Sequence, residues 1–181
     1  MMRIVFFFFL ISPFLSKAAE DCDLVAAFSQ TYFEEPHYKC GLCFKNIYRF
    51  IGTLPQLLRA KAQVIIIQQH SKGLKPLRPR EEVHRWGYHV VLDVEGKIFD
   101  YDFGKSPRIL EKRTYFETMF EKPPRGNPIH VRIIPAEDYM FLNKVVQNPV
   151  TGIPTKLEIR WFTDYSEPLY PSQMLDSYLK E

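Results

Sequence analysis

Three residue types that cooperate in thiol chemistry occur in this chain in the order cysteine, histidine, aspartate. Cys43 stands at the start of an amphipathic segment, His89 interrupts a β-branched run, and Asp100 and Asp102 follow shortly after it. In such a set, a cysteine thiolate attacks a carbonyl carbon and an imidazole carries the proton. A carboxylate then holds the imidazole in one tautomer. The residue types and their order therefore indicate a thiol-dependent acyl-transfer site.

The histidine and the two aspartates belong to a predicted hairpin. Two strands, 87–94 and 97–102, are joined by Glu95-Gly96, and a two-residue connection with glycine second favours a tight turn. With position 94 opposite 97, Asp102 lies opposite His89. Asp100 lies diagonal to His89 on the same face, about 7–8 Å away at Cα. Both carboxylates can face the imidazole, so the hairpin leaves the third member of the site open between them. The competing interpretation is a hairpin whose polar side chains simply face solvent.

The cysteine belongs to a predicted helix at 43–51, where apolar residues recur at helical spacing. Backbone amides at a helix start stabilise a thiolate and an oxyanion. The chain has three cysteines, an odd number that leaves at least one unpaired. We expect Cys22 to pair with Cys40 or to stay reduced, which leaves Cys43 free. A Cys40–Cys43 disulfide is the alternative, and it would abolish a thiol mechanism.

Zinc binding is the main competing use of the same residues. Cys40, Cys43, His84 and His89 superficially match a two-cysteine, two-histidine site. About 40 residues separate the two pairs, against about 12–15 in short zinc modules. On an extended chain the two histidines lie about 16 Å apart, and they point to opposite faces. We therefore predict neither a metal nor another cofactor.

The segments around these residues predict an α+β domain. Strands are expected at 63–69, 87–94, 97–102 and 130–134. Helices are expected at 43–51, 55–60, 106–120 (with Ser106 as cap and Pro107 first) and 135–142. The predicted architecture is a set of N-terminal helices packed on an antiparallel sheet of about four strands.

Composition and the N-terminal residues limit where this domain acts. The 181 residues suffice for one domain, and a net charge of +3 gives no case for nucleic acid. Residues 1–19 are typical of a signal peptide, with Arg3, an apolar run of about 12 residues and a cleavage site after Ala18 or Ala19. That run is too short to span a bilayer, so no stable membrane anchor is expected. We predict a single domain at 20–181 that is secreted or periplasmic.

Three stretches resemble the protein N-terminal glutamine amidohydrolases: Leu42–Tyr48, Trp86–Leu92 and Ile98–Asp102. The resemblance covers about residues 38–141, and its histidine motif is the most specific part. The motif residues that match are Cys43 and Asn46, then Trp86, Tyr88, His89 and Val90, and Asp100 in the position of the catalytic aspartate. The resemblance implies a papain-like core without a cofactor and a catalytic triad of Cys43, His89 and Asp100.

The same resemblance implies a reaction and a substrate class. Its members convert an N-terminal glutamine to glutamate and release ammonia through a thioester. This chain departs from their pattern at Phe44, Lys45 and Gly87, where they carry acidic residues. We expect a monomer that acts on a protein or peptide with a glutamine side chain. The alternatives are a deamidase effector for internal glutamine, a papain-like cysteine peptidase, a transglutaminase-like exchange and a secreted binding module with a degenerate site.

Overall fold

A computed structural model describes residues 24–30, 42–69, 72–80, 84–106, 108–142, 145–147, 154–157 and 170–180. A helix occupies 24–30. The remaining elements are α2 (Cys43–Thr53), α3 (Gln56–Lys61), β1 (Ala62–Gln68), β2 (Tyr88–Val94), β3 (Lys97–Asp100), β4 (Arg108–Glu111), α4 (Lys112–Met119), β5 (His130–Pro135), α5 (Ala136–Leu142), β6 (Val145–Gln147), β7 (Pro154–Leu157), β8 (Ser172–Met174) and α6 (Leu175–Tyr178). The domain is therefore of the α+β class, as the sequence predicts.

One antiparallel sheet forms the centre of the domain. Its strand order is β4-β3-β2-β1-β5-β8, and β6 and β7 form a separate two-stranded ribbon. The four predicted strands are all present and occupy the middle of the sheet. The predicted number of about four is wrong, because β4 and β8 extend the sheet to six strands.

The strand β4 corrects the predicted helix at 106–120. Residues 108–111 pair with β3, and the helix begins only at Lys112. Ile109 packs against the apolar cluster on one face of the sheet, and Leu110 packs against the cluster on the other face. Both apolar side chains of this edge strand are therefore partly buried. The backbone N–H and C=O groups of residues 108–111 could be satisfied either in a helix or by pairing with β3. In this structure they pair with β3.

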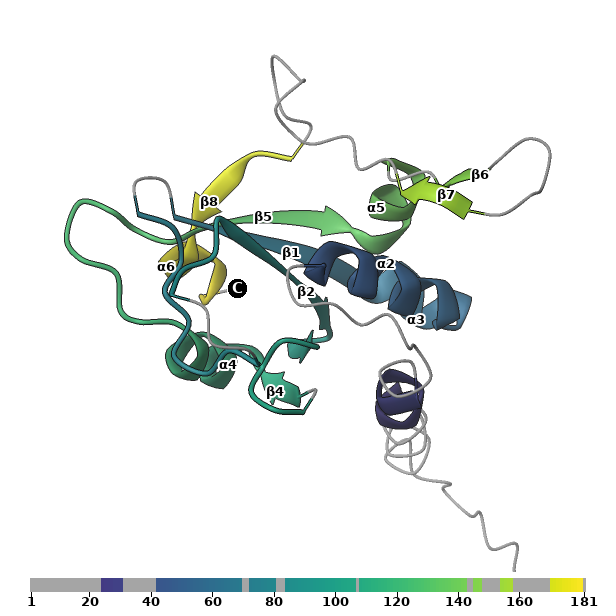
Figure 1. The fold of residues 1–181 in the computed structure, drawn as a ribbon, viewed down its shortest axis with the longest axis horizontal. Coiled ribbons are helices and arrows are strands. Elements are labelled where there is room, and N and C mark those ends of the chain that lie inside the picture. The colour runs from purple at the N-terminus through teal and green to yellow at the C-terminus, as the bar shows by residue number, and fades with distance from the viewer. Residues whose placement is uncertain are drawn as a thin grey trace, which may run out of the picture.

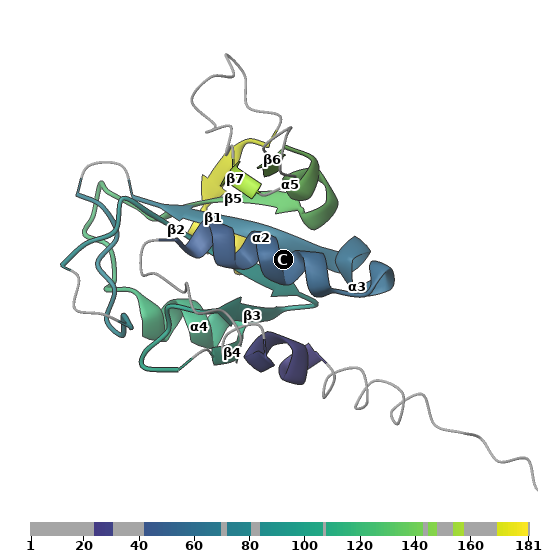
Figure 2. The same cartoon turned by 45° about the vertical axis from the view of Figure 1, so that its right-hand side comes forward.

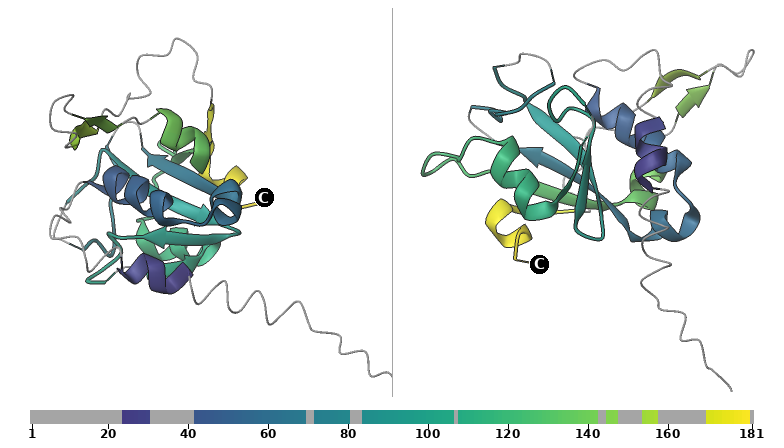
Figure 3. Two further views of the ribbon diagram at one scale, coloured as in Figure 1. Left: turned by 90° about the vertical axis from the view of Figure 1, so that its right-hand side faces the viewer. Right: turned by 90° about the horizontal axis from the view of Figure 1, so that it is seen from below.

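Two layers of helices cover the two faces of the sheet (Figure 1). The helices α2 and α5 and the segment 24–30 pack against one face, and α4 and α6 pack against the other. Figure 2 shows α2 running alongside β1 and β2, and the right-hand view of Figure 3 shows the strands between the two layers. All four residues from Val64 to Ile67 are buried, because helices cover both faces of β1. This explains why these four positions are all apolar instead of alternating with polar residues.

The β2–β3 hairpin has the predicted turn and register. Val94 pairs with Lys97, and Glu95 and Gly96 have φ of 52° and 84°, as a turn that matches the strand twist requires. The paired ladder ends at Leu92 and Phe99. β3 stops at Asp100, two residues earlier than predicted, and the chain bends at Tyr101 and Asp102. The hairpin is therefore open at the end that carries His89.

Some predictions concern residues that the structure does not describe. The signal peptide at 1–19, Cys22, Cys40 and Pro107 lie outside the described ranges. None of the helices in the described ranges combines the length and the hydrophobicity that a membrane span requires.

Candidate active site

Cys43 is the first residue of α2, as the sequence predicts. The helix begins without a side-chain cap at Leu42 and without an acidic residue in its first turn. The amides of Lys45 and Asn46 both donate to the Leu42 carbonyl oxygen, at 2.9 and 3.1 Å. The amide of Cys43 precedes this hydrogen-bonded turn and lies at the positive end of the helix. Cys43 carries a free thiol and is 6 % exposed, so the thiol needed for acyl transfer is present.

His89 reaches the thiol from the second position of β2. Its side chain is 2 % exposed, and one ring nitrogen lies within 4.8 Å of the Cys43 sulfur. Cys43 belongs to the apolar cluster on the α2 face, whereas the rings that surround His89 belong to the cluster on the α4 face. The two residues meet at the open end of the hairpin.

Asp100 holds the other side of the imidazole. Its Oδ1 lies 3.1 Å from His89 Nε2 and accepts the backbone N–H of Asp102 at 2.8 Å. Its Oδ2 accepts the hydroxyl hydrogen of Tyr115 at 2.7 Å. Asp100 is 1 % exposed, so water does not reach its carboxylate. These donors supply the hydrogen bonds that water would otherwise make to it. Nε2 thus faces the carboxylate, which leaves Nδ1 for the thiol.

Asp102 lies near the site but in a different position. The bend after Asp100 brings a carboxylate oxygen of Asp102 within 4.8 Å of both the Cys43 sulfur and a nitrogen of His89. Asp102 is 3 % exposed. The hairpin thus brings both carboxylates to the site, but the hydrogen bond from Nε2 goes to Asp100.

The electrostatic surroundings of His89 favour its charged form. Burial alone lowers the pKa of an imidazole, but the charge and hydrogen bond of Asp100, together with Cys43, raise the pKa of His89 well above its usual value. The site therefore supports an imidazolium between a carboxylate and a sulfur, which is the arrangement that activates a thiol.

Two aromatic residues fix this geometry: Trp86, which belongs to the histidine motif, and Tyr115, which the sequence patterns did not single out. Trp86 stacks on His89 with ring centroids 4.4 Å apart and planes at 28°. Tyr115 comes from α4 on the far side of the sheet, and burial and the charge of Asp100 raise its pKa well above the usual range. Since Tyr115 lies 15 residues beyond its acceptor, only the requirement that a buried carboxylate be satisfied signals that such a donor exists.

Two polar groups lie at the first turn of α2, which also carries Cys43. The Tyr139 hydroxyl of α5 donates to the Phe44 carbonyl oxygen at 3.3 Å and ties α5 to the first turn of α2. Asn46 is 7 % exposed, and its Nδ2 has no hydrogen-bond partner among the described residues. Residues three apart on a helix share a face, so the Asn46 amide lies on the same side of α2 as Cys43 and could donate a hydrogen bond there.

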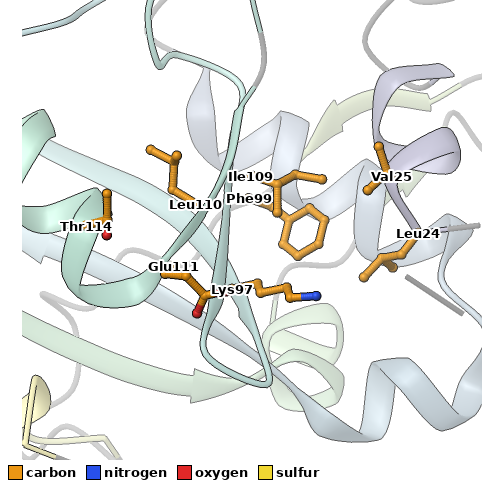
Figure 4. Close-up of a pocket in the computed structure, with 8 residues that line it drawn as sticks. All are labelled: Leu24, Val25, Lys97, Phe99, Ile109, Leu110, Glu111 and Thr114. Carbon is orange, nitrogen blue, oxygen red and sulfur yellow. The ribbon is translucent and has the colours of Figure 1, made fainter. Parts of the chain in front are cut away.

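A cavity of about 440 Å³ lies elsewhere, between the segment 24–30 and the β3–β4 edge. Figure 4 shows its lining residues: Leu24, Val25, Lys97, Phe99, Ile109, Leu110, Glu111 and Thr114. None of them belongs to the cysteine–histidine–aspartate group, and neither a cysteine nor a histidine lines the cavity. Volume alone therefore does not identify the functional site of this domain.

The remaining histidine of the zinc alternative does not join the group. His84 is exposed, and the described residues able to hold an ion together are Cys43, His89 and Asp102. Cys40 lies outside the described ranges.

Comparison with known proteins does not assign this site to a family. No protein-family model matches the sequence, and a search of curated proteins gives no match either.

Proposed function

We propose that this chain is a thiol-dependent amidohydrolase that removes ammonia from glutamine side chains. One observation carries the proposal. Cys43, His89 and Asp100 are buried together, with one nitrogen of His89 within 4.8 Å of the sulfur and Nε2 3.1 Å from the Asp100 carboxylate. The glutamine substrate rests on the resemblance of the motifs around Cys43, His89 and Asp100 to the amidohydrolases.

The first half of the reaction forms a thioester. His89 accepts the proton of the Cys43 thiol, and the thiolate attacks the carboxamide carbon. The oxyanion lies at the start of α2, where the Cys43 amide donates to it. The imidazolium returns its proton to the nitrogen, the C–N bond breaks and ammonia leaves. Asp100 remains ionised and stabilises the imidazolium throughout.

The second half hydrolyses the thioester. His89 accepts a proton from water, the hydroxide attacks the acyl carbon, and the C–S bond breaks. The proton on His89 returns to the sulfur, and the glutamic acid product releases its carboxyl proton to solvent as a glutamate carboxylate. No cofactor takes part in any of these steps.

Substrate selection involves the surface beside the triad. Gly87 is exposed, and a Cβ at this position would contact no atom within 4 Å. Carboxylates are the natural partners of a substrate α-ammonium, and positions 44, 45 and 87 provide none here. We therefore keep both N-terminal and internal glutamine as substrates of the proposed enzyme. Export as a secreted or periplasmic monomer stays a prediction from residues 1–19 and the composition.

Mass spectrometry of paired peptides tests the reaction. Peptides with N-terminal or internal glutamine are incubated with the full chain, and ammonia and the amide-to-acid mass change are measured. We expect Cys43→Ala to abolish both, and a matched Cys22→Ser/Cys40→Ser variant to retain both. Full ammonia release by Cys43→Ala would refute the proposal. A cut peptide bond without ammonia would instead identify the papain-like peptidase, and transfer to an added amine would identify the transglutaminase-like exchange.

A further inference from the structure

Asp102 is a buried carboxylate for which the triad has no use. It is 3 % exposed, and its backbone N–H donates to Asp100 Oδ1. Its carboxylate lies within 4.8 Å of the Cys43 sulfur and of a nitrogen of His89, although the hydrogen bond from Nε2 goes to Asp100. A second carboxylate beside a thiolate repels it, whereas a metal ion would attract both groups.

We propose that Cys43, His89 and Asp102 form a Zn²⁺ site, and that zinc bound there switches off the thiol. The binding rests on the geometry of these three side chains, whereas the inhibition rests on the proposed function. A sulfur, an imidazole nitrogen and a carboxylate oxygen are all zinc ligands. Tetrahedral zinc with bonds of about 2.0–2.3 Å holds such atoms roughly 3.3–3.6 Å apart. The three atoms already lie within 4.8 Å of one another, so movements of about an ångström bring them into range.

The surroundings of the three ligands fit a zinc site. Zinc-bound histidine commonly donates its other ring N–H to a carboxylate, and Asp100 accepts from Nε2 at 3.1 Å, which leaves Nδ1 for the metal. Tyr115 in turn donates to Asp100 at 2.7 Å. With the thiol deprotonated, two carboxylates and a thiolate face one imidazole, and a divalent cation offsets this negative charge. The ligand set differs from the cysteine–histidine pattern that the sequence suggested, because Asp102 contributes and His84 does not.

Zinc binding and catalysis exclude each other at this site. As the metal binds, bonds form to sulfur, nitrogen and oxygen, and the thiol proton passes to solvent without any change of oxidation state. The sulfur lone pair that would attack the substrate is then held by zinc. The imidazole nitrogen that would accept the thiol proton is held as well. Saturating zinc should therefore stop the reaction completely.

Binding is measured first, on the reduced, metal-free full chain with Zn²⁺ alone in competition with a chelating dye. We expect one ion per chain, with the affinity lowered at least about tenfold by Asp102→Asn and by Cys43→Ala. His84→Ala and Cys22→Ser/Cys40→Ser are the matched controls and should retain the wild-type affinity. Unchanged affinity in Asp102→Asn, or a loss in His84→Ala, would overturn the proposed ligand set.

Two measurements on the wild type do not depend on how well a variant folds. Co²⁺ in place of zinc should give a sulfur-to-metal charge-transfer band, and Zn²⁺ should slow alkylation of Cys43, read by mass spectrometry of its peptide. Mg²⁺ and Ca²⁺ prefer oxygen ligands and should do neither. Unslowed alkylation of Cys43 at saturating zinc would overturn the site.

Activity then separates this inference from the proposed function. Ammonia release should fall on zinc addition and return on chelation, each variant being compared with its own zinc-free rate. If zinc binds but the zinc-free chain shows no Cys43-dependent reaction, the site stands and the proposed function fails. If the reaction proceeds at full rate in saturating zinc, the inference fails and the function stands. Loss of activity on chelation, restored by zinc, would overturn inhibition and show a metal-dependent enzyme.

Discussion

Replacing each aspartate in turn by asparagine decides which carboxylate serves the histidine. In Asp100→Asn, the amide oxygen can still accept from Nε2 and from the Asp102 backbone N–H, and the amide nitrogen can donate to the Tyr115 oxygen. The substitution therefore keeps an acceptor for His89 and Asp102, reverses the direction of the Tyr115 contact and removes the charge. Asp102→Asn is the matched change at the neighbouring carboxylate.

The distances give the size of the two effects. A full charge 3.1 Å from Nε2 stabilises the imidazolium by about 5 kcal/mol at an effective dielectric constant of about 20. Since the asparagine oxygen recovers part of this, kcat/KM should fall about 10³–10⁴-fold in Asp100→Asn. Asp102 lies within 4.8 Å of both the sulfur and the imidazole, so it stabilises one charge and destabilises the other by similar amounts. Its replacement should change kcat/KM less than about tenfold.

The assay is ammonia release from a glutamine peptide at saturating and limiting substrate, with a chelator present to remove zinc. Circular dichroism and thermal unfolding confirm that both variants are folded at the assay temperature. Equal losses in the two variants would contradict the assignment of Asp100, and so would an Asp100→Asn variant that keeps a tenth of the wild-type rate.

Substitutions at four further positions probe the contacts of the triad and the backbone around it. Trp86→Ala removes the ring stacked on His89 and should lower kcat/KM about two- to tenfold in the ammonia assay, whereas Trp86→Phe should lose less; equal losses would count against a stacking role. Tyr115→Phe removes a hydroxyl that donates to a buried carboxylate, and should lower the free energy of unfolding in urea by about 1.5–3 kcal/mol; an unchanged value would show that this bond contributes nothing. Gly73 and Gly96 have φ of 69° and 84°, so alanine at either costs about 1–2 kcal/mol. At Gly73 the new Cβ also lies 2.7 Å from the Trp86 carbonyl oxygen, so Gly73→Ala should lower the melting temperature more than Gly96→Ala, and equal shifts would refute this argument.

Local pattern was enough for the elements that carry the site. The apolar run at 64–67 predicts a strand buried on both faces, and Glu95-Gly96 predicts the turn and the pairing of Val94 with Lys97. Helical spacing after Cys43 predicts α2. These signals depend on neighbours in sequence, and each is confirmed.

The sequence pattern gave the wrong prediction where contacts between residues far apart in the sequence determine the conformation of a segment. Residues 108–111 carry no strand signal of their own beyond two apolar residues, and they form β4 because the edge of β3 is available. The hairpin register puts Asp102 opposite His89, but pairing stops at Leu92 and Phe99, and the bend after Asp100 changes which carboxylate meets the ring. The Tyr115 hydroxyl that donates to Asp100 comes from α4, in another layer of the fold.

The sequence by itself determined the residue types, the start of the helix at Cys43 and the face of the strand on which His89 and Asp100 lie, because these follow from local periodicity and turn chemistry. Only the tertiary structure decided that the imidazole bonds to Asp100, that Asp102 lies beside the thiol, that Trp86 stacks on the ring and that Tyr115 donates to Asp100. The physical reason is that a hydrogen bond requires positions correct to a few tenths of an ångström. Such precision comes from the packing of α2 and α4 on opposite faces of one sheet, which local sequence does not encode.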